Sequence, residues 1–129
     1  MRADFTDGVT WERVKEKIAE PTDEGFGADV DFVEDQSLAG LDEAAITAGY
    51  PRTYPHGYRH PVLFVVDAVA VSVSDHPVLV VNLNAGVDVG PFRALPRQVQ
   101  SIQNNLSLAN MDYIEFARST GADGVFRGF

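Results

Sequence analysis

The chain contains no cysteine, and its lysines are confined to Lys15 and Lys17. Without cysteine the protein forms no disulfide, no thiolate zinc site and no cysteine nucleophile. The glycine-rich phosphate-binding patterns G-x-G-x-x-G and G-x-x-x-x-G-K-S/T are missing, as are the G-x-S-x-G elbow and the H-E-x-x-H zinc motif. These absences speak against nucleotide-dependent phosphoryl transfer and simple serine-hydrolase chemistry, and we predict neither a cofactor nor a metal ion.

Long apolar runs are also missing. No stretch approaches the roughly 18 apolar residues of a membrane-spanning helix, and the first residues run directly into acidic sequence without a basic segment and apolar core. The 129 residues, 45% of them hydrophobic and 22% charged, suit one globular domain over residues 1–129. We therefore expect a single cytoplasmic domain that binds no membrane.

Positive charge is absent from a long stretch of the first half. The formal net charge is −9 at pH 7, and no Lys or Arg lies between Lys17 and Arg52. Such an acidic field repels phosphate backbones and attracts a basic protein face, so we predict no nucleic-acid partner. Solubility alone is the competing explanation for the acidity. The candidate interaction surface consists of Asp23, Glu24, Asp29, Asp31, Glu34 and Asp35.

The first half predicts two helices and a strand. Trp11, Val14 and Ile18 keep helical spacing, with Asp7 or Thr10 as the cap and Pro21 as the end. Residues 28–33 alternate apolar and acidic side chains, which predicts a half-buried strand. Residues 42–48 predict a short helix, and a loop rich in Pro, Gly, Tyr and His follows over residues 49–61.

The middle of the chain predicts a sheet. Residues 62–66 are apolar at every position and predict a central strand covered on both faces. Residues 69–73, 78–83 and 92–95 predict further strands, with short connections that favour an antiparallel meander, and residues 3–5 predict a stub of a first strand. The order of elements predicts the α/β class, with α+β as the alternative: a mixed sheet of about five or six strands packed with three or four helices.

Two helices are predicted in the C-terminal block, over residues 97–108 and 112–119. Val99, Ile102 and Leu106 form an apolar stripe. Asn104 and Asn105 are poor helix formers, and their amides either hydrogen-bond locally or bind a ligand. Asp112 is a candidate N-cap. Val125, Phe126 and Phe129 are expected to bury the end of the chain.

The run NNLSLANMDYIEFA, followed by DGVFRGF, resembles the ending of an uncharacterised bacterial family of small proteins. Members share the form NNLSLANMD-aromatic-x-EFA before DGVFRGF. Agreement is weaker around Asp4-Phe5, residues 11–14 and residues 76–81, and the segment 54–60 departs from the family pattern. The resemblance implies a domain of unknown function, and it assigns no catalytic residue.

The histidines are the weak catalytic candidates, together with Asp112. His56 and His60 are four residues apart, a metal-ligand spacing on a helix, but the surrounding Pro and Gly residues disfavour a helix there. His76 follows Asp75 and could form a general-base pair, although Ser-Asp-His-Pro is also an ordinary turn before a strand.

Two functions from different classes are consistent with these features. The first is a non-catalytic acidic interaction module, immunity-like or regulatory, that binds a basic protein partner. The alternative is a small enzyme or ligand-binding protein, with a small-molecule pocket formed by the Tyr54–His60 loop and the C-terminal helices. Its ligand-binding residues would be Tyr54, Tyr58, Asn104 and Asn105.

Overall fold

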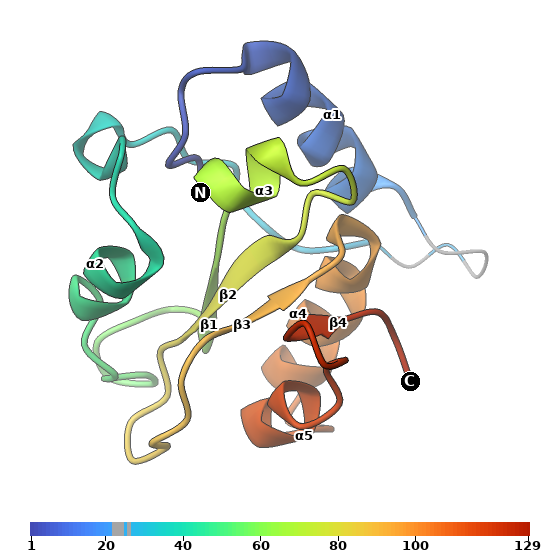
Figure 1. Ribbon diagram of the computed structural model, residues 1–129. Coiled ribbons are helices and arrows are strands. Elements are labelled where there is room, and N and C mark those ends of the chain that lie inside the picture. Colours follow the sequence, from blue (N-terminus) through green and yellow to red (C-terminus); the bar gives the residue numbers. More distant parts are fainter. Residues whose placement is uncertain (22–24, 26) are drawn as a thin grey trace.

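A mixed four-stranded sheet lies at the centre of the computed structural model, which describes residues 1–21, 25 and 27–129 (Figure 1). The strand order is β1-β2-β3-β4; β2 is antiparallel to both β1 and β3, and β4 runs parallel to β3. The strands are β1 (Val62–Val65), β2 (Val78–Asn82), β3 (Phe92–Ala94) and β4 (Val125–Phe126).

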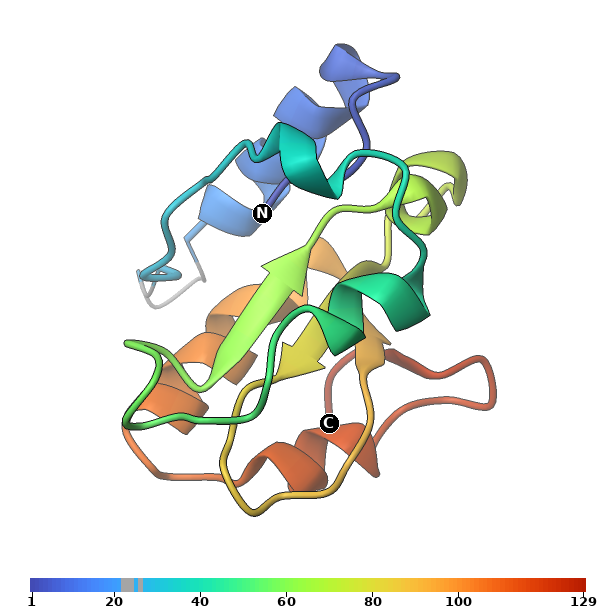
Figure 2. The same cartoon turned by 90° about the vertical axis from the view of Figure 1, so that its left-hand side faces the viewer.

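Helices cover both faces of this sheet, and because two of its three strand pairs are antiparallel the fold belongs to the α+β class. In Figures 1 and 2, α2 lies on one side of the sheet and α4 and α5 lie on the other. The helices are α1 (Gly8–Ala19), α2 (Glu43–Ala48), α3 (Ala68–Ser72), α4 (Val99–Ser107) and α5 (Tyr113–Ala117), with 3₁₀ turns η1 (Gln36–Leu38) and η2 (Pro96–Gln98).

The central strand β2 is buried along its whole length. Val78 and Val80 pack in a core cluster with residues of α1, α4 and α5, whereas Leu79 and Val81 pack in a second cluster with Ile46 of α2. This division follows from the alternation of side chains along a strand. Because both clusters share β2, the strand needs apolar residues at consecutive positions.

The mixed sheet predicted from the sequence is confirmed, with four strands and five α-helices in the described residues where five or six strands and three or four helices were expected. Two details differ. The strand predicted over residues 69–73 is wrong, because this segment forms helix α3, whose first turn is capped by the Asp67 carboxylate through the Ala70 amide at 3.1 Å. The apolar residues 62–65 form an edge strand in the sheet order, and β2 takes the central position.

The strand predicted over residues 28–33 does not form either. These residues have no strand assignment, and only Glu34 joins a neighbour, through a bridge to Arg2. Val30 nevertheless packs against the first core cluster while Asp29 and Asp31 face solvent. An extended segment alternates its side chains as a strand does, so the sequence pattern cannot distinguish the two.

The helices predicted in the C-terminal block are confirmed, and the junction between them has a defined geometry. Ala109 lies in the left-handed region with φ of 56°. Its amide bonds to the Leu106 carbonyl at 3.2 Å, and the Asn110 amide bonds to the Asn105 carbonyl at 2.9 Å. These two bonds form a Schellman motif, in which glycine is the usual residue at the left-handed position.

The next helix begins at once with Asp112 as its N-cap, as predicted. The Asp112 amide donates to Glu115 Oε2 at 2.7 Å in a capping box. The Tyr113 hydroxyl donates to the Gly90 carbonyl at 2.9 Å and so ties α5 to the β2–β3 connection. Burial raises the pKa of Tyr113 above its usual range, because the phenolate would lose its hydration.

The chain end is only partly buried, contrary to the prediction. Val125 and Phe126 lie in the core, but Phe129 is 77% exposed. Its ring still contacts the rings of Phe126 and Phe116, with centroids 5.0 and 5.5 Å apart.

No helix in the described residues is both long and apolar enough to cross a membrane.

A buried ion pair connects the sheet to two helices. Arg93 of β3 binds the Asp67 carboxylate with two hydrogen bonds of 2.9 and 2.8 Å, and it also donates to the Pro77 carbonyl and to Glu43 of α2. Asp67 is 4% exposed. Burial opposes the charge on Arg93, but the two carboxylates outweigh it and raise the pKa of the guanidinium.

We expect Asp67→Ala to lower the free energy of unfolding by about 3–5 kcal/mol, because it removes the cap of α3 and the bidentate acceptor of the half-buried Arg93, which keeps only Glu43 as an anionic partner. Urea denaturation measures the loss. Asp88→Ala is the matched control, since Asp88 pairs with Arg52 while its own side chain is fully exposed, and we expect little change there. Equal effects of the two substitutions would contradict a special role for the buried pair.

We expect Ala109→Gly to raise the free energy of unfolding by up to about 1 kcal/mol, because glycine adopts the left-handed conformation without the clash of a Cβ atom. Ala45→Gly in α2 is the control of opposite sign, since glycine within a helix destabilises it. Thermal denaturation of both variants tests this, and a Tm for Ala109→Gly below that of the native protein would contradict it.

Candidate binding groove

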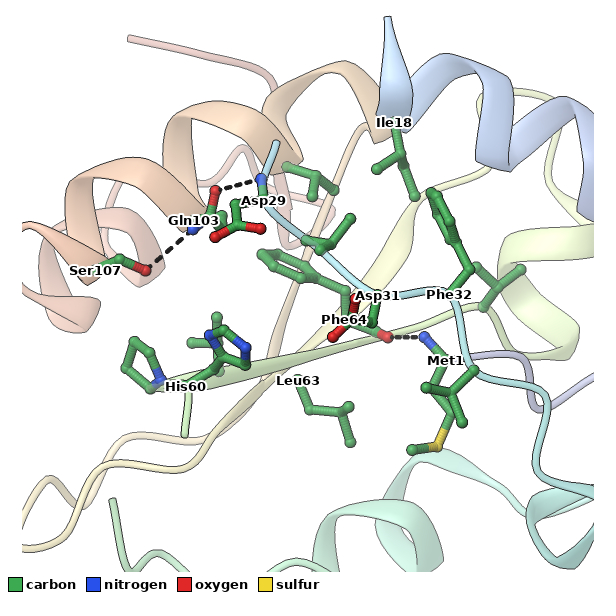
Figure 3. Close-up of a pocket in the computed structure, with 16 residues that line it drawn as sticks. Met1, Ile18, Asp29, Asp31, Phe32, His60, Leu63, Phe64, Gln103 and Ser107 are labelled. Atoms are coloured by element: carbon green, nitrogen blue, oxygen red, sulfur yellow. Dashed lines mark hydrogen bonds between the residues drawn. The ribbon is translucent and has the colours of Figure 1, made fainter. Parts of the chain in front are cut away.

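The segment 27–34 runs past helix α4 and strand β1 and is attached near both ends. The Asp29 amide donates to Gln103 Oε1 of α4 at 2.8 Å, and the Arg2 amide donates to the Val33 carbonyl at 2.8 Å. Gln103 is buried, and its Nε2 donates to Ser107 Oγ at 3.1 Å (Figure 3). One amide side chain therefore holds the segment against α4.

A cavity of about 210 Å³ lies between this segment, β1 and α4 (Figure 3). We call it the groove. Its apolar lining comes from several parts of the chain: Met1, α1, the 27–34 segment, β1 with the residues on either side of it, and α4. The lining includes Ile18, Val30, Phe32, Val62, Phe64, Val66 and Val99. An opening of this kind between layers is a usual place for a ligand.

One corner of the groove is made by aromatic rings. Phe32 meets the buried Trp11 of α1 edge to face, with ring centroids 6.2 Å apart. The Arg2 guanidinium and the Lys15 ammonium lie over the Trp11 ring, at 5.7 and 5.2 Å from its centroid. The Lys15 ammonium also lies 6.0 Å from the centroid of Phe32, so these cation–π contacts hold both positive charges at the aromatic corner.

Polar groups also line the groove: Asp29, Asp31, His60, Gln103 and Ser107. The carboxylates of Asp29 and Asp31 are exposed, and neither forms an ion pair or a side-chain hydrogen bond with another residue that the structure describes. Two uncompensated negative charges therefore lie beside an apolar cavity.

The backbone of Met1 closes one end of the groove. Its nitrogen donates to the Phe64 carbonyl at 2.6 Å, and the Val66 amide donates to the Met1 carbonyl at 2.8 Å. Burial lowers the pKa of the Met1 amino group to about 5, because the charged form would lose its hydration.

The structure distinguishes the roles of four of the six residues of the predicted interaction surface. Glu34 pairs with Arg2 at 3.0 Å, and the Asp35 carboxylate accepts from the Ser37 amide at the start of η1. Asp29 and Asp31 lie at the groove. Asp23 and Glu24 lie outside the described residues. Part of the acidic character is structural, because four helices begin at an aspartate N-cap: Asp7, Asp42, Asp67 and Asp112.

The four residues of the predicted small-molecule pocket do not come together. Tyr54 and Tyr58 pack against the second core cluster, on the α2 side of the sheet. Asn104 and Asn105 belong to α4 on the other side, where Asn105 Nδ2 donates to the Ser101 carbonyl one turn earlier at 2.8 Å. His60 is the residue of the 54–60 loop that lines the groove.

The remaining catalytic candidates are dispersed. His56 is exposed, and Asp112 is an N-cap. His76 is buried with φ of 52°, and its Nδ1 lies 2.9 Å from the Ala70 carbonyl, where it satisfies the end of α3, while Asp75 is exposed. Within the described ranges, no group of three or more His, Asp or Glu side chains could hold a metal ion.

Gln103 and the edge of β1 are the groove residues that sequence reasoning missed. Gln103 follows Val99 by four residues and precedes Leu106 by three, so its amide lies on the apolar side of α4. A single amide within an apolar stripe is the signal that could have indicated a buried hydrogen-bonding role. Nothing in the sequence indicates that β1 is an edge strand.

A family model described as a domain of unknown function, DUF6924, matches residues 1–129. The chain belongs to this family. The expected membership of a family of unknown function is thereby confirmed, and the match extends to the segments that form the groove. No curated protein and no solved structure shows a match to the chain. The DUF6924 domain carries no assigned activity, so its groove is interpreted from its own residues.

We expect Gln103→Ala to lower the free energy of unfolding by about 1–3 kcal/mol, because it leaves the Asp29 amide without its acceptor. Hydrogen exchange at that amide should accelerate. Gln100→Ala, which alters a half-buried residue of the same helix, is the control and is expected to change stability by less than about 0.5 kcal/mol. Unchanged exchange at Asp29 in the Gln103 variant would contradict the attachment of the segment through this side chain.

Proposed function

We propose that this protein is a non-catalytic binding module, immunity-like or regulatory, that takes a segment of a basic protein partner into the groove. An apolar side chain of the partner enters the cavity, and a neighbouring Lys or Arg meets Asp29 and Asp31. The observation that carries the proposal is the position of these two carboxylates, without a described partner, beside an apolar cavity.

The dimensions of the groove support this function. A cavity of about 150 Å³ is large enough for benzene, so 210 Å³ accepts one side chain of leucine or phenylalanine size. Burying such a side chain contributes about 1.5–3 kcal/mol. Burial of the partner's apolar side chain therefore supplies affinity, and the two carboxylates select basic residues next to that side chain.

The net charge of the chain acts on the same partner at longer range. A formal charge of −9 attracts a basic protein and accelerates its encounter at low ionic strength. Surface charge pairs add little stability one by one. We therefore expect the overall charge to govern the association rate, and the groove to govern the lifetime of the complex.

A small-molecule role is the second candidate, and the polar groups inside the apolar lining favour it. Gln103, Ser107 and His60 lie along the cavity and could orient a small ligand. An apolar amine would fit both the cavity and the carboxylates. An enzymatic role has less support, because two of the catalytic candidates have local structural roles: the His76 ring bonds to the Ala70 carbonyl, and Asp112 caps α5.

Selection of a random peptide display library on the native protein tests the first function. We expect enrichment of peptides that carry Lys or Arg beside an apolar residue, and about tenfold weaker binding of these peptides to the Asp29→Asn/Asp31→Asn variant. The substitution keeps size and removes charge. High salt should weaken binding to the native protein as well.

The matched control is Glu16→Gln/Asp75→Asn, which removes the same charge from two exposed positions that do not line the groove. It should retain most of the affinity. Selected peptides that bind both double variants equally would place recognition elsewhere on the surface. A selection that yields no basic peptide would argue for the small-molecule role.

A further inference from the structure

Three chain segments run parallel beside the edge of the sheet. Arg2 forms a parallel bridge to Val66, immediately after β1, and another to Glu34, at the end of the 27–34 segment. The residues around Arg2 therefore act as a short strand between two others. Strands lie about 4.8 Å apart, so β1 and the segment are roughly two strand spacings apart at this level.

The groove continues the line of this short strand. Met1, Val62, Phe64, Asp31 and Val33 all line it. In Figure 3, β1 runs from His60 towards Met1, and the segment from Asp29 to Phe32 passes along the other side. The cavity thus lies where a strand leading into Met1 would lie. An extended peptide between the two segments would occupy this space.

Backbone groups on both sides of this position point into it. The Met1 nitrogen bonds to the Phe64 carbonyl, and the Ala3 amide bonds to the Val66 carbonyl. The backbone N–H and C=O groups of the even-numbered residues along β1 therefore point away from β2. By the same alternation the Val62 carbonyl and the Phe64 amide face the groove. Neither forms a hydrogen bond with a described residue outside the sheet.

The other side of the position follows the same pattern. The Arg2 amide bonds to the Val33 carbonyl, so the odd-numbered residues of the segment present their backbone groups to the short strand. The Val33 amide and the Asp31 carbonyl therefore face the groove as well. An extended peptide in this position would find donors and acceptors along both of its edges.

We propose that the partner segment binds as a β-strand inserted between β1 and the 27–34 segment, parallel to β1 and in line with Met1. This inference rests on the proposed function and specifies how the basic segment is held. Strand addition at a sheet edge supplies affinity through the main chain and specificity through alternate side chains. The inserted strand bonds to Val62 and Phe64 on one side and to Asp31 and Val33 on the other.

The side chains around the position define the sequence that fits. Val30 and Phe64 pack against the first core cluster, and Ile18 and Val99 form the floor on that face. Asp29 and Asp31 are exposed to solvent. Alternate residues of the inserted strand point to the floor and to the carboxylates, so the partner segment alternates apolar and basic residues and has an apolar residue next to Met1.

The probe for this inference is the capped peptide Ac-Lys-Val-Lys-Leu-NH₂, added to the full chain in the millimolar range. We expect it to slow hydrogen exchange of the Phe64 amide at least tenfold, as measured by NMR. The Val65 amide, which already belongs to the ladder with Leu79, is the internal control and should change far less. The peptide with its second lysine N-methylated should bind at least tenfold more weakly, because that amide would donate to Val62.

A second peptide of the same composition, Ac-Val-Lys-Leu-Lys-NH₂, reverses the alternation and should also bind at least tenfold more weakly. Peptide binding without protection of Phe64, or equal binding of the N-methylated peptide, would overturn strand insertion and leave the proposed function standing. Failure of all these peptides to bind would overturn strand insertion together with the basic-segment function on which it rests.

Discussion

The buried pair between Arg93 and Asp67 determines how the sheet is connected. Asp67 caps α3, and α3 is the turn that brings the chain from β1 back into β2. Arg93 fixes that cap to β3 and, through Glu43, to α2. Because a buried carboxylate without its guanidinium is strongly unfavourable, this pairing stabilises the connection from β1 to β2 against β3. The groove exists because β1 lies at the edge of the sheet, with no complete neighbour on its other side.

The groove follows from how the first third of the chain returns to this edge. Only the residues around Arg2 pair with the end of β1, and the 27–34 segment is held away from the rest of the strand by Gln103 and by Val33. The apolar side chains of α1 and α4 then form a floor under a space that no described residue fills. Asp29 and Asp31 lie beside this space, whereas the other described acids nearby are used in a cap or an ion pair.

The sequence predicted the elements whose signals are local. Helix α1 combines a cap at Asp7 with apolar spacing, and α5 begins at Asp112; both signals lie within a few residues. The prediction of a strand over residues 69–73 was wrong. These β-branched residues form a helix whose cap, Asp67, is held in place by Arg93, 26 residues away. Of the groove, charge alone indicated Asp29 and Asp31. The cavity, Gln103 and the open edge of β1 depend on tertiary distances that no local pattern contains.

The aromatic corner of the groove gives the molecule an intrinsic optical probe. Trp11 is the single tryptophan of the chain, and its indole nitrogen is buried without a hydrogen-bond partner among the described residues. Its ring meets Phe32, which forms part of the groove wall. An occupant that displaces Phe32 changes the surroundings of this indole directly. The fluorescence of the unlabelled protein therefore reports on the groove, free of background from tryptophan elsewhere in the chain.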